Sequence, residues 1–345
     1  MELAYERRWT DGLPVAPPTE ERVRAVLDYL GRDPGEVVGV IPPREGVATI
    51  EKVAINCVMA GCKPEYVPVV LAAVEAMLAT PFNLNGVQTT TNPCAPLAIV
   101  SGPAVERLEF NVNEGVFGGG ARANAAVGRA VRLILWNIGG AYPGDPDMAT
   151  LGHPGKYAFC IAENHALSPW EPLHVERGLP ADADAVTVFA CDSPHTIYVP
   201  GDARRILRVL AHTLPTPGVN MFHCAGQYLL AFSVKPAQAL ARAGWSKREV
   251  KRYIFEYARY RWGDLKRWGV LDPEEHATTY WGGVADAPWA AALDDEQLLP
   301  MVQSPDDIHV VCAGGTGQWW VGFCPGWGNY GGYAVTKPVR WPGGS

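Results

Sequence analysis

The chain has 345 residues, of which 48% are hydrophobic and 19% charged, enough for a substantial core and for about two domains of roughly 150 residues each. Its net charge of −7, without any basic run interleaved with aromatic residues, argues against nucleic acid or an anionic membrane as the main partner. No apolar stretch of roughly 18 residues and no signal-peptide core occurs, so we expect a soluble, cytoplasmic protein.

The first part of the chain reads as helices around short strands. Residues 19–31 have a Thr N-cap, acids in the first turn and a closing Gly, which predicts a helix. Residues 49–61 and 64–79 predict two more helices, and the second of these begins with Pro64. The apolar run 96–102 is typical of a buried strand.

Strand and helix patterns continue to alternate further along the chain. Helices are predicted over 121–139 and 202–214, together with one long helix over 246–269. The apolar runs 156–164, 185–191, 228–234 and 307–312 predict strands. This alternation predicts an α/β fold with a mostly parallel sheet flanked by helices.

Two segments of the sequence echo each other. Residues 97–110 and 229–244 share a strand, a turn, a Pro-Ala pair and an amphipathic stretch, and a basic helix follows each. The pattern is compatible with two related α/β halves, although a common supersecondary unit could also produce it. We place the domains at 1–180, with Cys62 and a Gly-rich loop, and 181–345, with an aromatic and Gly-rich tail.

Cys62 lies between a helix-ending glycine, Gly61, and a helix-starting proline, Pro64. The N-terminus of the following helix and the neighbouring Lys63 favour a thiolate, so Cys62 is a candidate nucleophile or redox thiol. The alternative is a tight corner between two helices with an inert, buried cysteine. The eight cysteines contain no CxxC pair, so we expect reduced thiols rather than a disulfide scaffold.

The second candidate region is the stretch 155–178, in which a strand runs into a loop rich in acids and histidines. Glu163 and His174 are candidates for general acid–base catalysis, and Asn164 for substrate binding, because polar groups at the carboxyl end of a parallel strand form ligand sites in α/β folds. A divalent metal held by these groups is a weaker alternative, since the spacing is not diagnostic. A plain surface loop is also compatible with the pattern.

The third candidate region is the Gly-rich run before the helix at 121–139. Gly119 and Gly120 would let a ligand approach the backbone, and Arg122 would clamp a carboxylate or phosphate at the helix N-terminus. Neither a P-loop nor a dinucleotide-binding pattern is present. We add Asn56 and Asn124 as candidate substrate contacts.

The C-terminal third of the chain is rich in tryptophan, tyrosine and glycine. Such residues form pocket walls or subunit interfaces, and we favour an interface, in a homo-oligomer or with a partner subunit.

Several long blocks, DGLPVAPPTEERV, EKVAINCVMAGCKPEY, GGARANAAVGRAVRLI, GKYAFCIAEN and SPWEPLHVERG, resemble in order a widespread bacterial family associated with UGSC-type (seleno)proteins. The resemblance covers most of residues 10–335. The motif of a selenocysteine or cysteine followed by Gly-Ser-Cys, found in the related selenoproteins, is absent from this chain. The resemblance implies that the matching positions matter for function, and these are Cys62, Arg122, Cys160, Glu163, Asn164, Glu171 and His174.

Together these features predict a thiol-dependent enzyme that acts on a small anionic metabolite as a lyase, transferase or reductase. Cys62 would attack, Arg122 and the glycines would bind the anion, and Glu163 or His174 would move protons. The alternative is a non-catalytic subunit that binds a thiol- or selenol-bearing partner protein. No cofactor is specified by the sequence.

Overall fold

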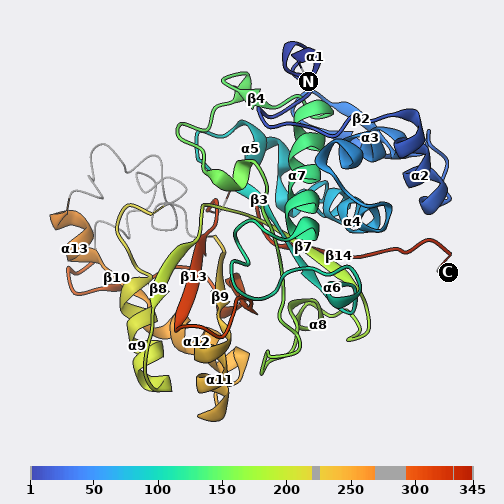
Figure 1. The fold of residues 1–345 in the computed structure, drawn as a ribbon. Helices are drawn as coiled ribbons and strands as arrows, with labels where there is room; N and C mark the ends of the chain where they lie inside the picture. The colour runs from blue at the N-terminus through green and yellow to red at the C-terminus, as the bar shows by residue number, and fades with distance from the viewer. Residues whose placement is uncertain (1, 220–225, 269–292, 329, 344–345) are drawn as a thin grey trace.

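The structure, a computed structural model, describes residues 2–219, 226–268, 293–328 and 330–343. Its core consists of two four-stranded sheets that lie face to face, with helices on the outer face of each (Figure 1). The chain is therefore α/β, as predicted, in four layers. The site described below lies where the edges of the two sheets meet.

The first sheet has the strand order β14-β7-β3-β6. Strands β3 (Ala95–Ser101) and β6 (Cys160–Ala162) are parallel, whereas β7 (Ala185–Cys191) is antiparallel to β3 and β14 (Val335–Pro338) is antiparallel to β7. The helices α6 (Ala104–Arg107) and α7 (Arg122–Asn137) provide the crossover between the parallel pair.

The second sheet has the order β12-β9-β13-β8. Strands β9 (Tyr228–Phe232) and β12 (Ile308–Cys312) are parallel, and β13 (Trp320–Pro325) is antiparallel to both β9 and β8 (His195–Tyr198). The prediction of a mostly parallel sheet is therefore wrong. In the two four-stranded sheets only the pairs β3–β6 and β9–β12 are parallel, and each is joined by a long connection that contains helices.

Successive side chains of each strand point to opposite faces of its sheet, and this alternation explains the four layers. On β3, Leu97 and Ile99 face the second sheet, while Ala98 and Val100 face the helices. Helices α4 (Val67–Met77) and α7 pack on the first sheet, α3 (Ile50–Ala60) packs against α7, and α2 (Glu20–Leu30) packs against α3. Helices α9 (Ala203–Thr213), α11 (Val234–Arg242) and α12 (Lys247–Tyr257) cover the second sheet. Strands buried on both faces appear in the sequence as continuous apolar runs.

The predicted helix over 246–269 is wrong as a single element. The chain leaves α12 at Ala258, whose backbone is extended, and forms β10 (Arg259–Arg261) before α13 (Trp262–Arg267). Strand β10 pairs with β11 (Leu298–Pro300), so a long-range pairing overrides local helix propensity. Residue 269 lies outside the described residues.

The remaining elements are short or peripheral. They are α1 (Glu2–Glu6), β1 (Val37–Ile41), β2 (Gly46–Thr49), η1 (Pro64–Tyr66), η2 (Thr80–Phe82), α5 (Leu84–Thr89), β4 (Tyr142–Pro143), β5 (Pro146–Asp147), η3 (Pro154–Lys156), α8 (Leu173–Glu176) and η5 (Pro305–Asp307). No single helix of the described residues is long and apolar enough to cross a membrane; only α3 taken together with η1 and α4, bent by 120°, reaches that length and composition.

The two sheets share one topology. In each, an edge strand is parallel to its neighbour, and the next two strands run antiparallel in turn. The echo seen in the sequence falls on equivalent elements, because 97–110 contains β3 and α6 and 229–244 contains β9 and α11. Segments 95–198 and 228–338 therefore repeat one arrangement of strands.

Hydrogen-bond register agrees with this equivalence. At the end of the parallel pair, Glu163 N–H donates to the Val100 carbonyl at 3.0 Å, and Ala313 N–H donates to the Phe232 carbonyl at 2.9 Å. Beyond the fourth strands, Val339 N–H donates to the Asp184 carbonyl at 2.7 Å, and the equivalent bond from Val199 N–H to the Trp319 carbonyl measures 2.8 Å.

Each repeat gives its last strand to the other sheet. Strand β8 follows β7 in the chain but pairs with β13, and β14 follows β13 but pairs with β7. The first sheet thus contains strands from both sides of residues 180 and 181, where the domain boundary was predicted. That boundary stays a prediction.

Candidate functional site

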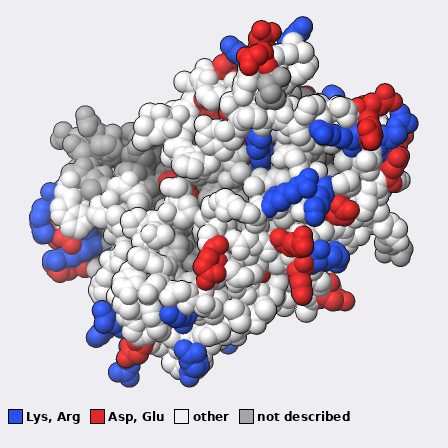
Figure 2. Space-filling model, viewed as in Figure 1, with Lys and Arg blue, Asp and Glu red and all other residues white. Residues whose placement is uncertain are grey.

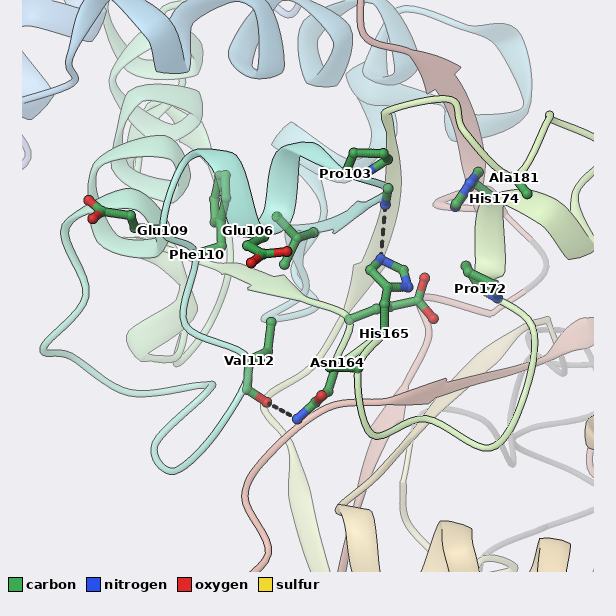
Figure 3. A pocket seen from close by; sticks show the side chains of 14 residues that line it. Pro103, Glu106, Glu109, Phe110, Val112, Asn164, His165, Pro172, His174 and Ala181 are labelled. Atoms are coloured by element: carbon green, nitrogen blue, oxygen red, sulfur yellow. Dashed lines mark hydrogen bonds between the residues drawn. The ribbon is translucent and has the colours of Figure 1, made fainter.

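A cavity of about 650 Å³ opens at the carboxyl ends of the parallel strands β3 and β6. Glu163, Asn164 and His165 follow β6 directly, and Gly102 follows β3. Figure 3 shows His165 and His174 on one side of the cavity with Pro172 and Ala181, and Glu106 and Glu109 across from them. This is the position at which α/β folds commonly bind ligands.

Glu163 is a buried and anchored polar side chain of this cavity. It is only 3% exposed, and its Oε2 accepts hydrogen bonds from Ser101 Oγ at 2.5 Å and from Leu173 N–H at 2.9 Å. Burial raises the pKa of the Glu163 carboxyl, and the charge of Lys247 and these hydrogen bonds only partly offset the effect. Burial and these two hydrogen bonds therefore hold the Glu163 carboxyl in a fixed position with a raised pKa.

His165 is oriented by the backbone. Gly102 N–H donates to its Nε2 at 2.9 Å, which assigns the remaining ring proton to Nδ1 (Figure 3). Burial and the charge of Lys247 lower the pKa of His165, so the ring is neutral at pH 7. A neutral imidazole with Nδ1–H can donate a hydrogen bond to a bound molecule.

His174 is part of the cavity wall but presents neither nitrogen to solvent. Its ring is fully buried and lies edge-on to that of His165, with 6.2 Å between ring centres. Neither nitrogen makes a well-formed hydrogen bond, although the backbone of Pro180 and Ala181 lies near enough to act on its pKa. Burial nevertheless lowers the pKa of His174 overall.

A buried ionic group lies behind Glu163 and joins two lysines of the second repeat to a glutamate of the first. Lys247, at the start of α12, is almost fully buried, and its Nζ lies 3.1 Å from Glu176 Oε2. Lys251 Nζ bonds Glu176 Oε1 at 2.6 Å. Burial alone would raise the pKa of Glu176, but the two lysines outweigh it and lower the pKa. Packing between the repeats thus brings a positive charge close to Glu163.

The cavity lining is acidic. Glu106, Glu109 and Glu163 contribute carboxyl groups, and neither lysine nor arginine lines it. The other lining side chains are largely apolar and include Val105, Phe110, Val112 and Pro172. On the face of the molecule in Figure 2, charged side chains lie mainly toward the rim without a large patch of one sign. The lining favours a neutral or cationic ligand over an anion.

Two of the predicted substrate contacts instead hold one loop. Asn164 Nδ2 donates to Asn113 Oδ1 at 3.1 Å and to the Val112 carbonyl at 3.5 Å. Asn124 bonds the backbone of Asn111 twice, with Oδ1 accepting at 2.8 Å and Nδ2 donating at 3.0 Å. Asn164 also lines the cavity, so it fixes the segment 111–113 beside the site.

The corner at Cys62 has the predicted backbone. Gly61 ends α3 in the left-handed region with φ 87°, and Pro64 begins η1, which leads into α4. Cys62 is 8% exposed, and its thiol donates to the Ala126 carbonyl at 3.4 Å. Because a thiol that donates is stabilised as S–H, this contact does not favour a thiolate. Cys62 does not line the cavity of Glu163.

Arg122 lies next to Cys62 but is already engaged. Its Nε and Nη2 both donate to the Gly61 carbonyl, at 3.0 and 2.9 Å, and the side chain is exposed. The structure therefore brings Arg122 to the Cys62 corner and places neither residue in the cavity of Glu163. The anion-clamp role of Arg122 stays a prediction.

The remaining predicted contacts lie elsewhere. Asn56 is buried between α3 and α7, donating to the Lys52 carbonyl at 2.9 Å and accepting from Asn137 at 2.7 Å. Gly119 and Asn124 line a different cavity of about 390 Å³ with Cys160, and Gly120 has φ 112° in the loop before α7. The predicted binding residues thus do not converge on one cavity.

Three residues of the site were not among the candidates. His165 is adjacent to two that were, and Ser101 ends a predicted strand, so both carried a positional signal. Lys247 carried none, because only packing between the repeats brings it near Glu163.

Metal ligands are not grouped in the described part of the chain, which holds no cluster of three or more His, Cys, Asp or Glu placed around one ion. The cysteines at 57, 62, 94, 160, 191, 312 and 324 are all free.

Comparison of the chain with known protein families finds no family model that matches it. Comparison with curated proteins finds no match either. The resemblance to the family associated with UGSC-type proteins, and the cytoplasmic location, stay predictions.

Proposed function

We propose that the protein is an enzyme that moves a proton next to the carbonyl group of a small molecule bound in the cavity of Glu163. The observation that carries the proposal is the pairing of a buried, anchored carboxyl with a neutral histidine in one cavity. A carboxylate base and a neutral imidazole that polarises a carbonyl form a recurring solution for enolisation.

The chain's own groups account for each step. Glu163, as carboxylate, accepts the proton from the carbon next to the carbonyl, and the C–H electron pair shifts to form the enolate. His165 donates Nδ1–H to the enolate oxygen and stabilises its charge. Glu163 then returns its proton to the same carbon while the enolate electron pair re-forms the C–H bond and the carbonyl group is restored, so no electrons are gained or lost. Ser101 and Leu173 N–H fix Oε2 of the carboxyl throughout.

The lining sets the substrate class. With Glu106 and Glu109 beside Glu163 and no cation in the lining, we infer a neutral or cationic carbonyl compound with a small apolar part. The anionic metabolite expected from the sequence finds no complementary charge in this cavity.

Only one of the two repeats carries the proposed chemistry, and we infer that the repeats are related halves of which the first holds the site. Positions equivalent to Glu163, Asn164 and His165 in the second repeat are Ala313, Gly314 and Gly315. The connection from β6 to β7 spans 163–184 and carries His174, whereas 313–319 joins β12 to β13. An added segment in the first repeat thus completes its site.

Thiol-dependent catalysis at Cys62, the function expected from the sequence, has less support. The cysteine is buried, donates to a helix carbonyl and does not line the cavity of Glu163. The alternative of a non-catalytic subunit for a thiol- or selenol-bearing partner stays a prediction.

Deuterium exchange tests the proposal with any compound that carries a C–H bond next to a carbonyl group. We would incubate the protein in D₂O with neutral and cationic carbonyl compounds, such as dihydroxyacetone and aminoacetone, and follow loss of the C–H signal by NMR. We expect enzyme-dependent exchange whose rate falls as pH falls through a pKa above the ordinary 4.5 of a glutamate, because the base must be ionised.

The variant Glu163→Gln keeps the acceptor for Ser101 and Leu173 but cannot take a proton, so exchange should fall by about 100-fold or more. The matched control is Glu51→Gln, an exposed glutamate on α3, which should exchange like the wild type. Equal rates for Glu163→Gln and the wild type, or no exchange with any compound, would refute the proposal.

A further inference from the structure

We propose a second binding site, for a small carboxylate with an apolar or aromatic body, in a cavity at the other end of the first sheet. The cavity, of about 430 Å³, lies between α7 and the segment 143–157, and Arg132 is part of its wall. It shares no lining residue with the cavity of Glu163. The proposal does not depend on the chemistry proposed for Glu163.

Arg132 is a buried charge without a carboxylate partner. The residue is 6% exposed, its Nε donates to the Lys156 carbonyl at 3.0 Å, and its Nη1 donates to Gln88 Oε1 at 3.3 Å. Within the described part of the chain it forms no ion pair, and Nη2 has no hydrogen bond. A buried guanidinium without an ion-pair partner is costly, and an anion bound beside it would offset that cost.

The nearby acids are already paired. Lys156 Nζ bonds both oxygens of Asp147, at 2.9 and 2.8 Å, and Arg129 Nη2 bonds Asp11 Oδ1 at 2.8 Å. Asp11, Asp147, Arg132 and Lys156 line the cavity and their charges sum to zero. Arg129 pairs with Asp11 from outside the lining, so the group as a whole carries one positive charge in excess. Burial lowers the pKa of His153 to about 4, so its ring adds no charge at pH 7. One excess charge suits a monoanion.

The remaining wall is apolar and aromatic. Trp136 on α7, Tyr157 after η3 and Leu151 line the cavity. Leu151 is 91% exposed. A carboxylate on Arg132 would accept a charge-assisted hydrogen bond from Nη2, the guanidinium nitrogen that no other group of the described residues occupies, and would place its apolar body against these side chains.

The two cavities lie at opposite ends of the first sheet. Gly102, at the cavity of Glu163, directly follows the carboxyl end of β3, whereas Lys156 and His153 precede the start of β6. The seven residues of β3 span roughly 20 Å. A carboxylate bound at Arg132 is therefore a different molecule from a substrate bound in the cavity of Glu163.

Titration calorimetry with benzoate tests the site, with benzamide as the uncharged isostere. We expect benzoate to bind the wild type and benzamide to bind at least about tenfold more weakly. Arg132→Gln should weaken benzoate about tenfold or more, and Arg208→Gln, an exposed arginine on α9, should leave it unchanged. Phenyl phosphate should bind more weakly than benzoate, because its second charge has no partner.

NMR on the wild type supplies a readout that does not depend on a variant folding. Benzoate should shift the indole N–H signal of Trp136, which donates to the Arg8 carbonyl at 2.7 Å, and leave residues around Glu163 unshifted. The proposal is overturned if the wild type does not bind benzoate, if benzamide binds equally well, or if benzoate shifts signals only outside this cavity. Tighter binding of phenyl phosphate would overturn the assignment to a carboxylate.

Discussion

Asp192, the first residue after β7, has surroundings that disfavour the ionised form of its carboxyl group. Its Oδ1 is buried without a hydrogen bond from the described residues, and burial raises the pKa of the carboxyl from 3.8 to about 6. A raised carboxyl pKa means that the folded state holds the proton more tightly than the unfolded state. Ionisation of Asp192 therefore destabilises the fold as pH rises from about 4 through 6.

We predict that Asp192→Asn is more stable than the wild type at pH 8 by about 1–3 kcal/mol, with the gap vanishing toward pH 4. The amide cannot ionise, so it removes a cost that exists only above the folded pKa. Urea unfolding at both pH values measures the effect, and Asp182→Asn, at an exposed position, is the control. A gap that does not change with pH would contradict the assigned cause.

Cys62 permits a direct test of the thiol hypothesis. Because it is buried and donates to the Ala126 carbonyl, we predict that iodoacetamide modifies it in the folded protein as slowly as the fully buried Cys57. Peptide mass mapping after timed alkylation measures both rates, and unfolding in urea should equalise them at a high value. Rapid, selective alkylation of Cys62 in the folded protein would instead revive the thiol-dependent alternative.

At the scale of single residues, the local backbone conformation could be predicted from the sequence. The contacts between residues that lie far apart in the sequence could not. Gly61 and Pro64 have the conformations that their residue types require, because helix ends are set within a few residues. The contacts of Cys62 with Ala126 and of Gly61 with Arg122 join segments more than 60 residues apart. Glu163 was identified because strand ends carry ligand sites, whereas Lys247 behind it was not.

Among the elements, the helices α2, α3 and α4 and the strands β3, β7 and β9 match the predicted segments. These elements have strong periodicity or unbroken apolar runs, which tertiary contacts reinforce. Strand direction could not be predicted, because it depends on which strands become neighbours. The division of 246–269 into α12, β10 and α13 likewise depends on the pairing of β10 with β11.

The packing of α7 on β6 gives a prediction at this scale. A Cβ at Gly128 would lie 2.7 Å from Phe159 N and 3.2 Å from Cys160 Cβ, so backbone and strand would have to move. Gly128→Ala gains about 1 kcal/mol of helix propensity, but we expect overpacking of about 1–3 kcal/mol to exceed it. We therefore predict net destabilisation in urea.

The control for this prediction is Ala125→Gly, at an exposed position of the same helix, which should lose about 1 kcal/mol through propensity alone. If Gly128→Ala stabilises the protein, the close approach of α7 to β6 is wrong.

At the scale of the whole molecule, exchange of the fourth strands makes the two repeats interdependent. Without β14 the first sheet ends at β7, and without β8 the second ends at β13. The apolar faces of both sheets, with Leu97 and Ile99 on one and Leu229 and Ala231 on the other, are buried only against each other. Yet only the first repeat carries Glu163 and His165, while the second supplies Lys247 behind them.

This exchange predicts that the chain, cut after Pro200 in the turn before α9, reassembles from its two fragments. We expect co-expressed 1–200 and 201–345 to purify as a 1:1 complex with a native-like circular dichroism spectrum. Fragment 1–200 alone should aggregate, because it exposes the inner face of its sheet and the unpaired edge of β7.

The control is the second fragment ended at Ala334, which lacks β14 but keeps β9, β12 and β13 for its own sheet. The complex with this shortened fragment should melt at a lower temperature than the full pair, because the strand it loses belongs to the other repeat's sheet. If each fragment folds alone as a monomer, or if the removal of β14 leaves the melting temperature unchanged, the exchange does not hold the two repeats together.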